Sequence, residues 1–350
     1  MKVKTTLAAA WLHRGALAWT LLPVAILHGL LVRLRWLAYS RIWLKPEQFS
    51  VPVLVVGNVV AGGAGKTPLV IALVKHFHAR GLRVGVVSRG YGRAEDDCKE
   101  VHLTTPLSIS GDEPALIKHA TEAPVFVAKN RSKAVRHLLL AHPDTALVIC
   151  DDGLQHYALH RDIEIAVFDD RGLGNRWLLP AGPLREPWPA RQHRGVDLVL
   201  HTGQAPAFAG FTSTRRLAPF AMAANGTKIL LTELKAQPLI ALAGIATPSA
   251  FFSMLRSQGL QLQKMIPLPD HYDFQAWNKN FFAADCLNHI VLCTEKDAIK
   301  IFGLEIPLTQ KVLAVPLEFK PEPAFFTALD SRVAPLLTDI NSQLLFGHGH

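Results

Sequence analysis

A glycine-rich segment at residues 57–68, GNVVAGGAGKTP, constrains the fold of this chain more than any other feature. It follows an apolar run at 51–58 that predicts a buried strand, and it precedes a segment at 68–80 that predicts a helix. Glycines let the backbone curl so that successive N–H groups face phosphate oxygens at the helix N-terminus. The segment therefore predicts a phosphate-binding loop between a strand and a helix.

The last residues of this loop carry the specific chemistry. Lys66 is placed to reach the outer phosphates of a nucleotide, and Thr67 to reach a magnesium ion. The strict pattern G-x-x-x-x-G-K-T would have glycine at Val60, so the loop is a variant in which neighbouring glycines supply the flexibility. The predicted phosphate-binding residues are Gly62, Gly63, Ala64, Gly65, Lys66 and Thr67.

Short β-branched apolar runs separated by helical segments continue after the loop, which predicts a mostly parallel sheet covered on both faces. Further strands are predicted at 82–90, 123–128, 146–152, 163–170 and 196–203. A second α/β series begins near residue 229, with strands at 238–246, 289–297 and 311–319 and a helix at 248–258. We therefore predict an α/β protein with an N-terminal membrane-associated helix (1–48), a P-loop NTPase-like αβα domain (49–210) and a second, smaller α/β domain (211–350).

The N-terminal segment combines apolar length with positive charge. Residues 1–50 hold seven basic side chains and one acidic one, so +6 of the net charge of +9 lies there. The run Ala16 to Val32 is uncharged for 17 residues, which is about 25 Å of helix, slightly short of a hydrocarbon core of about 30 Å. Basic and aromatic flanks favour a helix lying in the membrane interface. A single span, a signal peptide and an ordinary core helix are the alternatives. The basic residues are Lys2, Lys4, Arg14, Arg33, Arg35, Arg41 and Lys45, and the aromatic ones include Trp11, Trp19, Trp36, Tyr39 and Trp43.

Composition excludes several classes of protein. With 49% hydrophobic and 19% charged residues, the chain is neither a disordered tail nor a coiled coil. Its four cysteines, among them Cys286, lack CxxC spacing, so the sequence indicates no disulfide framework and no zinc cage. The basic excess suits anionic partners such as phosphates and acidic lipid headgroups.

Polar motifs follow several of the predicted strands. Asp151 and Asp152 end the run LVIC, where a nucleotide-bound Mg²⁺ needs oxygen ligands, although Asp152 as a helix cap is the alternative. A proline-rich loop holds Arg185 and Glu186 and is a candidate clamp on phosphate or metal. Arginines in SRGYGR (88–93) are weaker candidates for phosphate contacts.

Taken together and in order, these strings resemble the tetraacyldisaccharide 4′-kinase family, which makes the lipid A precursor of Gram-negative bacteria. The strings are GNxxxGGxGKTP, SRGYGR, GDEP, DDGLQH, LLPAGPLRE, DHYDF and TEKDAIK. The resemblance runs from the apolar N-terminus to about Lys300 and weakens at 203–226 and beyond Phe319.

The resemblance implies a role for each matching residue. Asp112 of GDEP and His271 of DHYDF would act together on the acceptor hydroxyl, with Asp112 as the proton acceptor and Asp270 supporting His271. Arg185 would stabilise charge on the transferring phosphoryl group. The residues implied around Mg²⁺ are Thr67, Asp152, Glu186 and Asp151, with His156 adjacent.

The resemblance thus implies a lipid kinase that moves the γ-phosphate of ATP, with Mg²⁺, to the 4′-hydroxyl of an acylated glucosamine disaccharide 1-phosphate, forming lipid IVA. The implied location is the cytoplasmic face of the bacterial inner membrane, with the lipid surface as partner and neither nucleic acid nor a protein partner inferred. A P-loop GTPase or metallochaperone-type NTPase is the alternative, because TEKD at 294–297 superficially resembles a base-reading motif. A nucleotide-binding membrane scaffold without catalysis is a further one.

Overall fold

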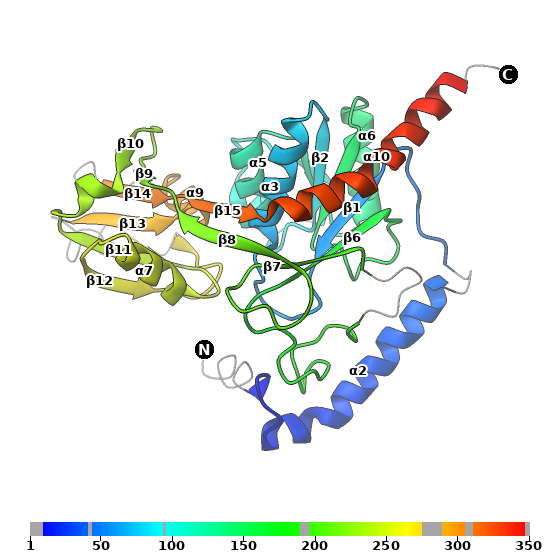
Figure 1. Ribbon diagram of the computed structural model, residues 1–350, viewed down its shortest axis with the longest axis horizontal. Coiled ribbons are helices and arrows are strands. Elements are labelled where there is room, and N and C mark those ends of the chain that lie inside the picture. Colours follow the sequence, from blue (N-terminus) through cyan, green and yellow to red (C-terminus); the bar gives the residue numbers. More distant parts are fainter. Residues whose placement is uncertain are drawn as a thin grey trace.

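The chain folds around two β-sheets that lie side by side, with a long N-terminal helix beside the larger one (Figure 1). The structure is a computed structural model that describes residues 10–40, 44–93, 96–189, 196–274, 289–304 and 311–346, without the side chains of Ser40 and 339–346. Several residues named above lie outside the described ones: Lys2, Lys4, Arg41, Trp43 and Cys286.

Within the described residues, the larger sheet has nine strands in the order β15-β8-β7-β6-β1-β5-β2-β4-β3. All its pairs are parallel except those of the two edge strands, β15 with β8 and β3 with β4. The central strands are buried along their whole length, as expected for a parallel sheet covered on both faces. The strands are β1 (Val53–Gly57), β2 (Val84–Ser88), β3 (Lys99–Glu100), β4 (Val125–Val127), β5 (Leu147–Asp151), β6 (Ile163–Phe168), β7 (Leu198–His201), β8 (Phe211–Leu217) and β15 (Leu317–Pro321).

Helices cover both faces of this sheet. One face packs against α3 (Lys66–His78), α5 (Asp112–Thr121) and α10 (Pro323–Phe346), whose Leu73, Ile117 and Phe325 share a core with Leu54 of β1. The other face packs against α6 (Arg131–Ala141), whose Val135 and Leu138 join Val55 and Val148. Alternate residues of one strand thus feed two separate cores. A short helix, α4 (Leu107–Ser110), precedes α5.

The second sheet, as far as the structure describes it, has six strands in the order β10-β9-β14-β13-β11-β12. Its two faces are covered by α7 (Pro248–Ser257) and α9 (Glu295–Ile301), and a 3₁₀ turn, η1 (Leu231–Leu234), precedes β11. The strands are β9 (Phe220–Met222), β10 (Lys228–Leu230), β11 (Leu239–Ala243), β12 (Leu262–Pro267), β13 (Ile290–Thr294) and β14 (Lys311–Val315).

A ribbon of two antiparallel strands connects the sheets. The chain leaves the larger sheet along β8 and returns along β15, with Leu217 opposite Leu317 and Ser213 opposite Pro321. The second sheet is therefore an insertion between two strands of the first, as Figure 1 shows.

Helix α2 (Ala16–Ser40) stands apart from the sheets, and its apolar side chains are mostly exposed. By length and composition it is able to cross a membrane, a property that it shares with signal sequences and with some core helices of soluble proteins. Two tryptophans hold this end of the chain against the loop at 177–180. The indole N–H of Trp11, which precedes the helix, donates to the carbonyl of Pro180 at 2.9 Å. The ring centroid of Trp19 lies 4.9 Å from that of Trp177.

The predicted fold class is confirmed, and each predicted strand contains an observed one. The segment 203–226, where the resemblance to the family weakens and no strand is predicted, holds β8 and β9. Because β8 and β15 pair with the first sheet, the separation between the sheets does not coincide with residue 210, and the predicted domain division stays a prediction. The N-terminal helix is also longer than the 17-residue apolar run, because it continues through Arg33 and Arg35 to Ser40.

The packing of α10 predicts a large stability effect for Phe325→Ala. The Phe325 ring is fully buried and lies 5.7 Å from that of Phe211. Truncation leaves a cavity, so we expect a loss of about 3–5 kcal/mol in the free energy of unfolding, measured by denaturant titration. Leu140→Ala, at a side chain that is 76% exposed, should change it by less than about 0.5 kcal/mol. Equal effects of the two substitutions would contradict the packing.

Candidate active site

The phosphate loop leaves β1 at Gly57 and enters α3 at Lys66. Gly62 and Gly65 have φ values of 100° and 80°, which glycine adopts without strain. The backbone N–H groups of Gly62 to Gly65 have no hydrogen-bond partner among the described residues. These donors lie at the N-terminus of a thirteen-residue helix, which is a favourable place for an anion.

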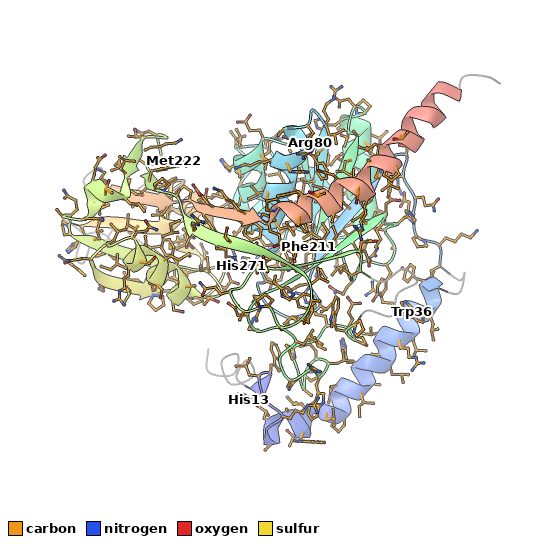
Figure 2. The ribbon with its side chains drawn as sticks, viewed as in Figure 1. His13, Trp36, Arg80, Phe211, Met222 and His271 are labelled. Carbon is orange, nitrogen blue, oxygen red and sulfur yellow. The ribbon has the colours of Figure 1, made fainter. Side chains whose placement is uncertain are left out.

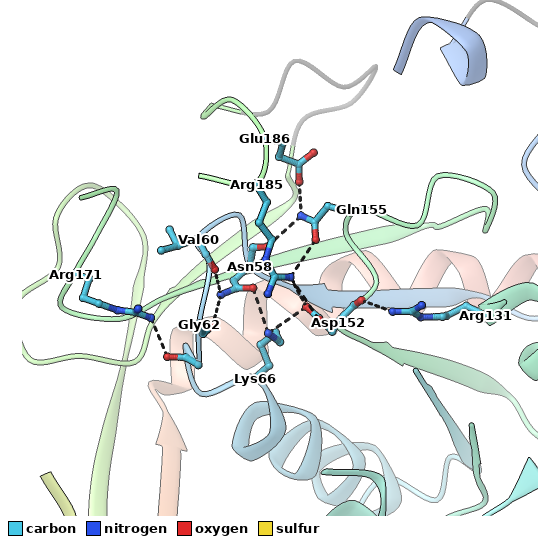
Figure 3. Close-up of polar contacts among 11 residues, drawn as sticks. Asn58, Val60, Gly62, Lys66, Arg131, Asp152, Gln155, Arg171, Arg185 and Glu186 are labelled. Carbon is cyan, nitrogen blue, oxygen red and sulfur yellow. Dashed lines mark hydrogen bonds and ion pairs between the residues drawn. The ribbon is translucent and has the colours of Figure 1, made fainter. Parts of the chain in front are cut away.

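The Lys66 ammonium lies across the open end of this loop (Figure 3). Its Nζ atom is 3.1 Å from Oδ1 of Asp152 and donates to Oδ1 of Asn58 at 3.2 Å. Asn58 is fully buried, and its amide nitrogen donates back to the carbonyls of Val60 and Gly62. The lysine is therefore paired within the protein, at the position where phosphates would bind.

Asp152 joins two cations from different parts of the chain. Besides Lys66, it pairs with Arg185 at 3.2 Å, and its backbone carbonyl accepts a bond from Arg131. Burial raises the pKa of Asp152, but the Lys66 and Arg185 cations outweigh it and hold that pKa below its usual value. The residue has a φ of 52° and precedes a turn, so the helix-cap alternative does not hold.

Asp151, the last residue of β5, is fully buried, and neither carboxylate oxygen has a hydrogen-bond partner among the described residues. Burial, with a smaller contribution from Glu113, raises its pKa to about 8. A buried carboxylate without donors is unfavourable unless a cation or a proton compensates it. Asp151 therefore suits a place beside a bound cation.

Glu186 is buried and already has two donors. Its carboxylate accepts a hydrogen bond from Gln155 at 2.7 Å and another from the Tyr157 hydroxyl at 2.7 Å. Gln155 also donates to the backbone of Asn58 and accepts from Arg185, so the loops carrying these residues are joined.

The predicted magnesium residues differ in how well they suit a metal ion. The described residues contain no group of three or more His, Cys, Asp and Glu side chains that would hold a metal ion by itself. A nucleotide-bound Mg²⁺ takes most of its ligands from phosphates and water, and needs only one or two carboxylates. Asp151 offers both carboxylate oxygens, whereas Asp152 is paired with Lys66 and Arg185, and Glu186 accepts from Gln155 and Tyr157.

A second polar cluster joins the two sheets, and Figure 2 labels His271 at the place where they meet. Asp112 begins α5 beside the first sheet, and its Oδ2 lies 3.0 Å from Nδ1 of His271, which follows β12. Lys300 of α9 contacts the same oxygen at 2.5 Å. Burial raises the pKa of Asp112, but hydrogen bonds from His271 and Lys300 and the charge on Lys300 lower it overall.

Asp270 and Lys296 complete this cluster. Asp270 accepts the backbone N–H of His271 at 3.1 Å and pairs with Lys296 at 2.9 Å. Lys296 also lies 3.3 Å from Nε2 of His271, and the Tyr91 ring centroid is 5.4 Å from that of His271. The structure thus brings Asp112, His271 and Asp270 together, as the sequence predicts.

A cavity of about 270 Å³ lies between α2 and the loop that carries Arg185. Cationic, aromatic and carboxylate side chains line it, so it is suited to a polar ligand with an anionic group. The lining residues are His28, Val32, Arg35, Gln155, Tyr157, Leu179, Arg185 and Glu186.

Residues of two further sequence motifs make contacts that hold the fold together and do not point into the site. Arg93 of SRGYGR donates to the backbone carbonyls of Ile109 and Val127 and to Asp97, which fixes local loops. In TEKD, Thr294 caps α9, and Asp297 is fully buried and accepts the N–H of Gly244. A base-reading aspartate would have to face its ligand, so this motif does not support a GTPase.

Comparisons with known proteins identify the family of this chain. Residues 17–334 match the family described as tetraacyldisaccharide-1-P 4′-kinase. The chain belongs to this family. It is 65% identical over 348 residues to a tetraacyldisaccharide 4′-kinase of Polaromonas naphthalenivorans, covering 99% of both chains. It is 52% identical to the protein of that name from Acidovorax sp., covering 94% of this chain and 95% of that one.

A solved structure of the family has the same fold. The crystal structure of LpxK from Aquifex aeolicus in complex with ATP superposes with a TM-score of 0.75 at 29% identity. It covers 93% of this chain and 99% of that one.

Family motifs point to several residues to which sequence reasoning assigned no role. Asn58, Gln155 and Lys300 lie inside the strings GNxxxGGxGKTP, DDGLQH and TEKDAIK, respectively. Their presence in these strings was the available signal. Their contacts were not predictable, because each reaches a residue that is distant in the sequence or on another element.

The ion pair between Lys300 and Asp112 predicts a pH effect. Lys300→Met removes a contact that favours the ionised carboxylate, so the pKa of Asp112 should rise. If turnover needs ionised Asp112, the acidic limb of kcat/KM for phosphate transfer should move to higher pH, with the largest loss at low pH. Lys320→Met, which removes an exposed lysine paired with Glu318, should leave the profile unchanged. A uniform loss at all pH values would contradict the prediction.

Proposed function

We propose that this chain is a lipid kinase that transfers the γ-phosphate of ATP to the 4′-hydroxyl of tetraacyldisaccharide 1-phosphate, forming the bis-phosphorylated lipid A precursor. The observation that carries the proposal is the convergence of Lys66 and Arg185 on Asp152 at the open end of the phosphate loop. The names of the relatives support the acceptor, and the complex of the Aquifex aeolicus protein with ATP supports the donor.

On the donor side, the free N–H groups of the loop would bind phosphate oxygens. Lys66 and Arg185 would exchange Asp152 for the β- and γ-phosphates, because both cations already lie at the mouth of the loop. Mg²⁺, when bound, offsets the charge on the phosphates and the leaving group. Thr67, Asp151 and Asp152 are the residues that we propose hold it, with Glu186 fixing Gln155 beside Arg185.

On the acceptor side, Asp112 would accept the proton of the 4′-hydroxyl as the bond from its oxygen to the γ-phosphorus forms. The bond from that phosphorus to the bridging oxygen breaks at the same time, and ADP leaves. His271 holds Asp112 through Nδ1, and Asp270 holds the backbone of His271. Transfer thus needs positioning and charge compensation, which these pairs supply.

The membrane supplies the acceptor, and α2 is the element that we propose meets it. Acylated substrates leave a bilayer with difficulty, since each buried CH₂ is worth about 0.8 kcal/mol. The exposed apolar side chains of α2 and its basic neighbours fit the cytoplasmic face of the inner membrane. The cavity beside α2, which includes Arg35, would then receive the anionic headgroup.

Incubation with γ-labelled ATP, Mg²⁺ and the disaccharide lipid tests the proposal directly. Label should enter the lipid with ATP and fail to enter it with γ-labelled GTP. Hydrolysis that is independent of the lipid, or equal use of GTP, would refute the assignment and favour an NTPase of another class.

Lys66→Ala should slow transfer by about 10²-fold or more, because one of the cations that balances developing charge is lost. Lys75→Ala, at an exposed lysine on the same helix, is the matched control and should retain normal turnover. Circular dichroism and thermal melting check that both variants are folded. Near-normal turnover by the Lys66 variant would rule out the donor-site assignment.

Charges on the exposed face of α2 should weaken membrane binding. Leu27 and Leu31 are each 57% exposed, so the double substitution Leu27→Asp and Leu31→Asp should spare the fold. Burying each leucine is worth about 1.5–3 kcal/mol, so binding to vesicles containing phosphatidylglycerol should fall more than about tenfold in co-sedimentation. Leu140→Asp, at an exposed leucine of α6, is the control. Unchanged binding of the double variant would exclude α2 as the membrane contact.

A further inference from the structure

Arg171, in the segment after β6, binds the phosphate loop from outside. Its Nη1 donates to the carbonyl of Ala61 at 3.1 Å, and its Nη2 to that of Gly63 at 3.0 Å. Figure 3 shows Arg171 on the side of the loop away from Lys66 and Asp152. No motif in the sequence assigns a role to this arginine.

These two bonds complete the hydrogen bonding of the loop carbonyls. Asn58 donates to the carbonyls of Val60 and Gly62, and Arg171 donates to those of Ala61 and Gly63, which alternate with them. The next carbonyl, that of Ala64, accepts from the hydroxyl of Thr202 at 2.9 Å. Every carbonyl from residue 60 to residue 64 therefore has a side-chain donor, and three separate elements supply these donors.

Holding a carbonyl also orients the N–H group of the next residue. In a planar trans peptide, the C=O of one residue and the N–H of the next point in opposite directions. With the carbonyls of Ala61 and Gly63 bound to Arg171, the N–H groups of Gly62 and Ala64 must point away from it. These two groups are among those without a partner in the described part of the chain.

Arg171 is itself fixed and charge-compensated. Asp169 accepts its Nε at 2.9 Å and its Nη2 at 2.7 Å, which orients the planar guanidinium group. A Cβ atom at Gly62 would lie 2.9 Å from Nη1 of Arg171, so a side chain there would displace the guanidinium group, and the φ of 100° at Gly62 itself favours glycine. Because its charge is compensated and its donors are engaged by carbonyls, Arg171 acts on the loop and does not replace Lys66 or Arg185 at the phosphates.

We propose that Arg171, oriented by Asp169, is a positioning residue that fixes the peptide planes of the phosphate loop so that its N–H groups face the nucleotide phosphates. This inference rests on the proposed function, since it requires a nucleotide in the loop. An arginine is needed because its fork holds two carbonyls and a carboxylate together, whereas a lysine ammonium cannot match that planar geometry.

The test compares Arg171→Ala and Arg171→Lys with wild type in the full-length chain. We expect KM for ATP to rise about tenfold or more in both variants, with kcat changed much less, because phosphate binding is lost equally from ground and transition states. KM for the disaccharide lipid should stay constant. The slowing of amide hydrogen exchange at Gly62 and Ala64 that ATP causes in wild type should be smaller in both variants. Arg83→Ala is the matched control. Arg83 pairs with Asp144 at 2.6 Å just before β2, at the amino end of this strand, whereas the phosphate loop follows the carboxyl end of β1.

The possible outcomes separate a positioning role from other effects of the substitutions. Loss of kcat at unchanged KM for ATP would indicate a smaller folded fraction and overturn the positioning role, as would full rescue by Arg171→Lys, because charge alone would then suffice. If wild type transfers phosphate from ATP and both variants keep its KM, only this inference fails. If wild type neither binds ATP nor transfers phosphate, the proposed function fails and this inference falls with it.

Discussion

The parallel pairing of β1 with β5 is the constraint on which the site depends. Val56 lies opposite Asp151 in this pair, so the phosphate loop and the two aspartates leave the sheet at the same edge. The backbone N–H of Gly153 donates to the carbonyl of Val56, which carries the pairing past the strand end. A Cβ atom at Gly153 would meet the Cys150 sulfur at 2.6 Å, so the chain can turn this closely only with glycine there.

The proline-rich loop is docked on the same edge by backbone hydrogen bonds. The N–H of Arg185 donates to the carbonyl of Val59 at 2.7 Å, and that of Ala61 donates to Pro183 at 2.8 Å. Arg185 therefore reaches Asp152 because its backbone is tied to the phosphate loop. The acceptor side has a different origin, since His271 and Lys300 come from the inserted sheet and meet Asp112 across the boundary between the two sheets. The residues around the phosphate loop are thus gathered at one end of a single sheet, whereas the cluster around Asp112 spans both sheets, which the β8–β15 ribbon connects.

Sequence reasoning recovered the features that periodicity and local motifs determine. The buried strands are continuous β-branched runs, so their places were predictable, and the phosphate loop identified the edge where ligands bind. Strand β8, which lies next to the edge strand β15, was missed because its residues Thr214 to Arg216 are exposed and polar and lack apolar alternation. Helix α10 was missed as well, since Pro335 lies inside its pattern. The contact of Arg171 with the loop had no local signal, because 108 residues separate it from Gly63.

The charges of the site compensate one another in the nucleotide-free protein. Lys66 and Arg185 share Asp152, while His271 and Lys300 share Asp112. Each pair spares a part-buried ion the desolvation penalty of standing alone, and it also holds the carboxylate ionised, because the neighbouring cations lower both carboxyl pKa values. A bound phosphate would replace Asp152 as the partner of two cations and leave that carboxylate free for a metal ion. Ion exchange within the site would therefore link donor binding to a metal ion. On the other side of the site, Lys300 and His271 likewise keep Asp112 ionised, which is the form that a proton acceptor needs.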